Sequence, residues 1–131
     1  MIKYLFIHAV STFILFTVWV NNLRFSRSEI GMAPLGLAFI IIILLPVGIV
    51  LSLLFRRQLQ SRSAMSVGLI IYLFLFQLVP LLGTEPWMDG VTDSGAQGMI
   101  NRAFVFTPLI TGLLTWIIIF LREPKQIDHN R

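Results

Sequence analysis

The chain has 131 residues, of which 56% are hydrophobic and only 12% are charged, and its mean hydropathy is +0.86. A soluble domain carries roughly 25% charged residues because its surface faces water. The composition therefore excludes an ordinary water-soluble domain and indicates a membrane protein. The net charge of +4 does not indicate a nucleic-acid-binding protein, because the ten basic residues form short clusters beside apolar runs rather than one solvated face.

Four stretches of the sequence contain no Asp, Glu, Lys or Arg. They cover residues 4–23, 30–55, 63–84 and 103–121 and hold 20, 26, 22 and 19 residues. A helix rises 1.5 Å per residue, so about 20 residues cross a hydrocarbon core of roughly 30 Å. The stretches are continuously apolar, which favours helices over the alternating strands of a membrane barrel. We predict an all-α integral membrane protein with four transmembrane helices.

The predicted spans form a single membrane domain, at about 4–23, 33–55, 64–83 and 103–121. The segments between them are short, so we expect successive helices to be antiparallel neighbours in an up-down bundle. Small residues four positions apart let helix backbones approach closely. Two such pairs are expected at helix contacts: Gly48 with Ser52, and Ala64 with Gly68.

The distribution of Lys and Arg predicts the orientation, since these residues gather on the cytoplasmic side of a membrane. Three lie in the predicted outward loops 24–32 and 84–102: Arg24, Arg27 and Arg102. Seven lie at the N-terminus, in loop 56–63 and in tail 122–131: Lys3, Arg56, Arg57, Arg62, Arg122, Lys125 and Arg131. We therefore place both termini in the cytoplasm and the protein in a bacterial inner membrane. No small-residue cleavage site follows the first run at a suitable distance, so we do not expect a cleaved signal peptide.

His8 is the one ionisable side chain inside a predicted span, apart from tyrosine. Ser11 and Thr12 lie on its own helix face, three and four residues further on. By depth, a cluster with Ser52, Tyr72 and Thr115 from other helices is possible. The two interpretations are a neutral imidazole held by a hydroxyl or water, and a proton-linked or ligand-binding group.

Three of the predicted spans contain a proline, each of which frees a helix carbonyl: Pro46, Pro80 and Pro108. Thr107, Thr111 and Thr115 form a hydroxyl stripe on one face of the last span, which either bonds back to its own helix or faces a neighbour or a wet cavity. In a dry environment, the donor hydrogens and the acceptor oxygen of the Gln77 side-chain amide all need hydrogen-bond partners. We expect it to pair with Thr107, Thr111 or the carbonyl freed by Pro108, around a polar outward pocket.

The predicted loop 84–102 contains the most distinctive polar segment, with candidate positions Glu85, Trp87, Asp89 and Asp93. Its acids could collect a cation, but the oxygen-ligand pattern of a calcium loop is absent. A headgroup anchor at Trp87 and an exposed recognition surface are the favoured interpretations.

The residue types limit the function classes. The chain has no cysteine and no acid inside a predicted span, and it shows no phosphate loop or catalytic triad. We predict a non-enzymatic protein without metal or cofactor, which contacts lipid and either a membrane-protein partner or a second copy of itself. It would be an accessory subunit or an immunity-type protein, and the alternative is a small oligomeric transporter or channel.

Overall fold

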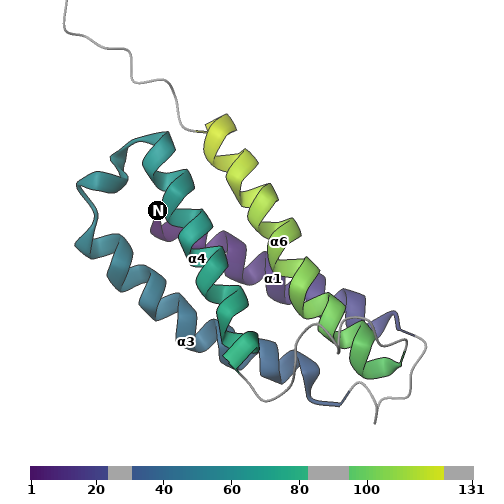
Figure 1. The fold of residues 1–131 in the computed structure, drawn as a ribbon. Helices are drawn as coiled ribbons and strands as arrows, with labels where there is room; N and C mark the ends of the chain where they lie inside the picture. The colour runs from purple at the N-terminus through teal and green to yellow at the C-terminus, as the bar shows by residue number, and fades with distance from the viewer. Residues whose placement is uncertain (24–30, 83–94, 123–131) are drawn as a thin grey trace, which may run out of the picture.

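A computed structural model describes residues 1–23, 31–82 and 95–122, and this part of the chain is helical and contains no strand (Figure 1). The α-helices are α1 (Ile2–Asn21), α3 (Ala33–Leu54), α4 (Arg62–Leu82) and α6 (Ala96–Arg122), with the short 3-10 helix η1 (Gln58–Gln60) between α3 and α4. Three of them, α1, α3 and α6, are long and apolar enough to cross a membrane. The apolar part of α4 with described side chains, Arg62–Leu78, is shorter. The prediction of an all-helical membrane protein is confirmed to this extent.

Local sequence signals place the helix starts. Gly31 has a φ of 52°, a left-handed turn conformation that glycine adopts without strain, and Pro34 then lies in the first turn of α3, where its missing amide hydrogen costs nothing. Ser61 precedes α4, and its hydroxyl accepts a hydrogen bond of 3.1 Å from the amide of Ala64. The polar linker between α3 and α4 therefore ends in a helix cap.

Helix α6 begins at Ala96, earlier than the predicted span that starts at residue 103. Its first two turns include the polar residues Gln97, Asn101 and Arg102, and the side-chain amide of Gln97 donates a hydrogen bond of 3.0 Å to the side chain of Asn101 one turn later. Charge-free runs detect only the part of a helix that fits hydrocarbon, so this polar extension was not predicted.

Helix α1 packs against both α3 and α6, while α4 packs against α6 (Figure 1). Helices α3 and α4 approach each other less closely. The main core combines buried side chains from all four helices, including Phe16, Leu37, Phe76 and Ala103. At Gly112, an added Cβ would lie 2.5 Å from Leu73, so the absence of a side chain sets the close approach of α6 and α4.

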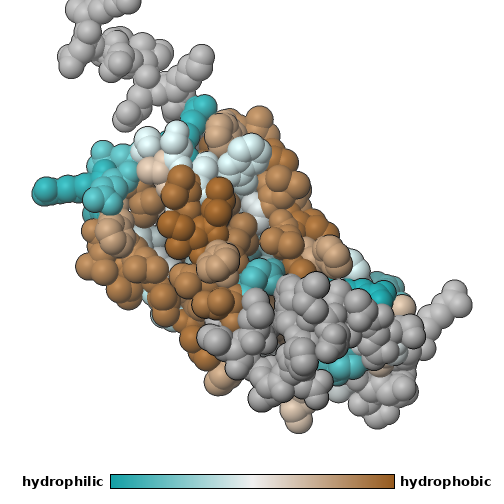
Figure 2. All heavy atoms as spheres, in the orientation of Figure 1, coloured by the Kyte–Doolittle hydropathy of each residue, from teal (hydrophilic) through white to brown (hydrophobic). Residues whose placement is uncertain are grey.

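The described surface is apolar along the helices and hydrophilic at the end where η1 joins α3 to α4 (Figure 2). A second core cluster, formed by Tyr4, Met65, Leu69 and Ile119, brings the start of α1, the start of α4 and the end of α6 together at this end. The six acidic residues of the chain all fall outside the described ranges. The end of the helices beside η1 carries five basic residues, and we call it the basic end. These residues are Lys3, Arg56, Arg57, Arg62 and Arg122.

Candidate functional site

A chain of hydrogen bonds joins α1 to α6 in the buried core. Thr111 donates its hydroxyl hydrogen to the carbonyl oxygen of Thr107 at 2.8 Å. A hydroxyl has one hydrogen to give, so in the 2.5 Å contact between the Thr12 and Thr111 hydroxyls it is Thr12 that donates. Both threonines are almost completely buried. The contact therefore ties the two helices together at one defined register.

His8 continues this network. Its Nε2 atom lies 3.1 Å from the carbonyl oxygen of Pro108, and since a carbonyl only accepts, Nε2 carries the hydrogen. The Thr12 hydroxyl oxygen lies 3.4 Å from the same nitrogen and can accept a second, weaker hydrogen bond from the Nε2 hydrogen. Sequence reasoning placed Thr12 on the face of His8, but gave no indication of Pro108 or Thr111 as partners on α6.

Aromatic rings enclose the imidazole. The rings of Tyr72 and Phe76 from α4 meet His8 edge to face, with centroids 5.6 Å and 5.8 Å away. Of the cluster expected around His8, Tyr72 is therefore adjacent. Ser52 lines a cavity that Tyr72 also borders, and Thr115 bonds within its own helix. Ser11 also bonds back to its own helix, through the carbonyls of Ile7 and His8.

The threonine stripe of α6 faces the protein interior. Thr107, Thr111 and Thr115 are each at most 1% exposed, and each donates to the carbonyl four residues earlier, at 2.7 Å, 2.8 Å and 2.7 Å. The sequence left open whether these hydroxyls bond to their own helix or face a neighbouring one. Thr111 does both, because it donates to a carbonyl of α6 and accepts a hydrogen bond from Thr12 of α1. The remaining two satisfy their hydroxyls inside α6 itself.

Gln77 lies on α4 and donates from Nε2 to the carbonyl oxygen of Val105 on α6, at 3.1 Å. The expected partners were Thr107, Thr111 and the carbonyl of Phe104, which Pro108 deprives of its amide donor. The structure selects the neighbouring carbonyl instead. Which carbonyl of a turn meets an amide depends on how the two helices are rotated, and no single-helix pattern contains that rotation.

Three buried side-chain atoms in the described ranges have no hydrogen-bond partner: His8 Nδ1, the hydroxyl of Tyr72 and Gln77 Oε1. Leaving a buried polar group unpaired costs about 1–3 kcal/mol. The polar groups of the core therefore hold the helices together without being fully satisfied.

The four loop candidates, Glu85, Trp87, Asp89 and Asp93, lie outside the described residues. Within residues 1–23, 31–82 and 95–122, no group of three His, Asp or Glu side chains is close enough to hold a metal ion.

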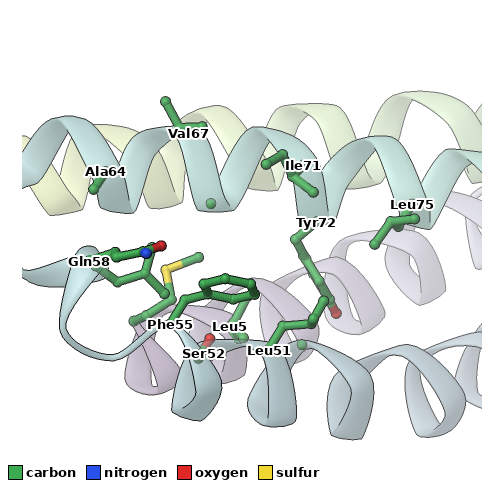
Figure 3. A pocket seen from close by; sticks show the side chains of 14 residues that line it. Leu5, Leu51, Ser52, Phe55, Gln58, Ala64, Val67, Ile71, Tyr72 and Leu75 are labelled. Carbon is green, nitrogen blue, oxygen red and sulfur yellow. The ribbon is translucent and has the colours of Figure 1, made fainter.

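A cavity of about 450 Å³ lies between the end of α3 and the first half of α4 (Figure 3). The start of α1 forms its floor through Met1 and Leu5, and the linker residues Phe55, Gln58 and Leu59 line one end. Both small-residue pairs, expected at helix contacts, border this cavity: Gly48 with Ser52, and Ala64 with Gly68. Two of these four residues make close approaches at its border. A Cβ at Gly48 would lie 3.0 Å from atoms of Leu5 and Tyr72, and a Cβ at Gly68 would lie 3.0 Å from Leu59 of the linker.

No protein-family model, curated protein or solved structure matches the chain. The function proposed below therefore depends on the geometry of the described residues and on the pattern of the sequence.

Proposed function

We propose that this chain is a non-enzymatic four-span membrane protein that binds a partner within the bilayer through the outer face of α3. The partner is another membrane protein or a second copy of the chain, which fits an accessory subunit or an immunity-type protein. The observation that carries the proposal is a proline on an exposed helix face. Pro46 lies in the interior of α3 with its side chain exposed.

Pro46 has no amide hydrogen, so the carbonyl of Ile42, four residues earlier, lacks its usual helical donor. The side chain of Ile42 is 66% exposed, so Ile42 and Pro46, one turn apart, both lie on the outward face of the helix. Lipid tails cannot donate hydrogen bonds, and a bare carbonyl in hydrocarbon costs free energy. A polar side chain from a partner helix would supply the missing donor.

The burial of the helices points to the same face. Only 22% of the apolar stretch of α3 is buried, compared with 39% for α1 and for α6. The buried positions of α3 form one narrow stripe, Leu37, Leu44, Gly48 and Ser52. Most of the remaining circumference is exposed and apolar, as expected of a helix that lacks one of its neighbours.

The four-span topology with both termini in the cytoplasm is part of the proposal. It is supported by the basic end, where Lys3, the linker arginines and Arg122 meet at one end of the helices. A Lys and Arg cluster of this kind stays on the cytoplasmic side during insertion.

The partner is tested by placing a photo-crosslinking amino acid at position 42 in living cells. We expect a discrete adduct of higher mass from Ile42, and none from a matched position on α4, Phe74, which is also 66% exposed. An adduct of twice the mass of the chain identifies a second copy. In a Pro46→Ala background, which restores the amide donor, the adduct should fall several-fold. Equal labelling at both positions, or no adduct at position 42, would contradict the proposal.

The alternative, an oligomeric transporter or channel, is favoured by one observation. His8 Nδ1 and Gln77 Oε1 are buried and unpaired, as they would be beside a route for protons or water. Proton flux into liposomes, followed with an internal pH dye under a potassium diffusion potential, separates the two functions. Our proposal predicts no flux above that of protein-free liposomes. A flux that His8→Leu and Gln77→Leu both reduce would establish the transporter instead.

A further inference from the structure

The cavity between α3 and α4 has a polarity gradient along its length. Eleven of its fourteen lining residues are apolar or glycine, and the exceptions are Ser52, Gln58 and Tyr72. The hydroxyl of Tyr72 is buried and has no hydrogen-bond partner among the described residues, and its ring forms part of the wall. The polar groups that remain, Ser52 and Gln58, belong to the end that faces the linker. Val67 and Ile71, both more than half exposed, line the open side.

A second hollow continues from that end. It is lined by the last residues of α3 and by the linker, and it shares Phe55 and Gln58 with the cavity. Two exposed arginines, Arg56 and Arg57, form part of its wall. Toward the basic end, the apolar part of the cavity is thus followed by the polar side chains of Ser52 and Gln58 and then by the two arginines.

We propose that the cavity holds one acyl chain of an anionic phospholipid, whose phosphate lies against Arg56 and Arg57 in the leaflet on the side of the basic end. This lipid site is separate from the proposed partner interface. The interface lies around Ile42, before Pro46 in α3, whereas the α3 residues that line the cavity come after Pro46, from Gly48 onward. A guanidinium binds phosphate through paired, charge-assisted hydrogen bonds, and anionic headgroups occur at this depth of a bilayer. Charge and polarity therefore match the two parts of such a lipid.

The size of the cavity favours a lipid chain over a partner helix. The lining residues of α4 run from Ala64 to Leu75, which corresponds to about 16 Å along the helix. A helix of that length and about 10 Å across occupies about 1,200 Å³. The cavity offers about 450 Å³, so a single extended chain fits and a helix does not.

The test uses the full-length protein reconstituted in nanodiscs that contain equal amounts of dioleoyl phosphatidylglycerol and dioleoyl phosphatidylcholine. Native mass spectrometry after release then reports which lipid is retained. We expect one phosphatidylglycerol per chain in the wild type. The Ala64→Phe variant places a ring in the cavity and should reduce this occupancy at least ten-fold. Ile70→Phe, a lipid-facing change on the same helix outside the cavity, should leave it unchanged.

The headgroup is tested by a pair of double variants. Arg56→Gln with Arg57→Gln should lower the preference for phosphatidylglycerol over phosphatidylcholine by roughly 30-fold, the value expected for two basic residues at an anionic surface. Arg56→Lys with Arg57→Lys keeps both charges and should retain most of the preference.

Three results of the lipid measurements would overturn the inference. They are a wild type that retains no lipid, an Ala64→Phe variant that retains it as the wild type does, and a lipid without headgroup preference. A photo-crosslinker at position 67 that labels a protein rather than lipid would assign the cavity to a partner helix, and would equally overturn it. None of these outcomes depends on the adduct formed at position 42, so the lipid site and the partner interface fail independently.

Discussion

Replacing Phe16 by alanine is expected to lower the free energy of unfolding by about 2–3 kcal/mol. Phe16 is completely buried, and its ring packs on that of Phe104 from α6 with centroids 4.6 Å apart. In a soluble core the loss would be about 3–5 kcal/mol. The value is smaller here because lipid solvates an exposed side chain almost as well as the protein interior does, so mainly the lost packing remains.

The measurement is unfolding of the protein in mixed micelles with increasing dodecyl sulfate, followed by the fluorescence of Trp19, which packs against the core. Phe13→Ala is the matched control, since Phe13 lies on the same helix but faces outward. It should change stability by less than about 0.5 kcal/mol. Equal effects at the two positions would mean that α1 is not packed between α3 and α6 as described.

Removing Arg56 and Arg57 of the linker together with Arg62 at the start of α4 is expected to abolish the preference for one membrane orientation. The sequence has seven Lys and Arg on the side assigned to the cytoplasm and three on the other. Changing Arg56, Arg57 and Arg62 to Gln leaves four against three, which is too small a difference to direct insertion. Reporter fusions at the C-terminus should then change from a single cytoplasmic location to a mixture of both sides.

The control variant increases the asymmetry. Arg24→Gln with Arg27→Gln leaves seven basic residues against one, so the C-terminal reporter should remain cytoplasmic. A wild-type protein with its two ends on opposite sides would refute the four-span topology. It would leave the helical packing described above intact.

Hydropathy predicted much of the fold, because each apolar run alone must form a helix in lipid. It placed α3 within a residue or two, since Pro34 and the polar linker mark its ends. It did not extend α6 back to Ala96, because Arg102 ends the charge-free run; the turns before it also contain the side-chain hydrogen bond from Gln97 to Asn101.

The candidate site was predictable only within single helices. Spacing correctly grouped His8 with Thr12, and Thr107 with Thr111 and Thr115, because residues four apart share a helix face. The contact of Thr12 with Thr111 depends on the rotation and depth of α1 relative to α6, which one sequence does not encode in any local pattern. For the same reason, the small residues Ala64 and Gly68 did not reveal what they approach: Gly68 lies close to Leu59 of the linker, and both small residues border the cavity.

The helices differ in how much bilayer they can cover. The charge-free part of α6 has 19 residues, about 28 Å, whereas α3 has 22 charge-free residues, about 33 Å. The longer apolar stretch, in α3, adapts to a thin membrane by tilting, but the shorter one in α6 has no reserve, because the polar residues Asn101 and Arg102 come directly before it. Lengthening the lipid tails should therefore strain α6 first, and this helix sets the upper limit of membrane thickness that the protein tolerates.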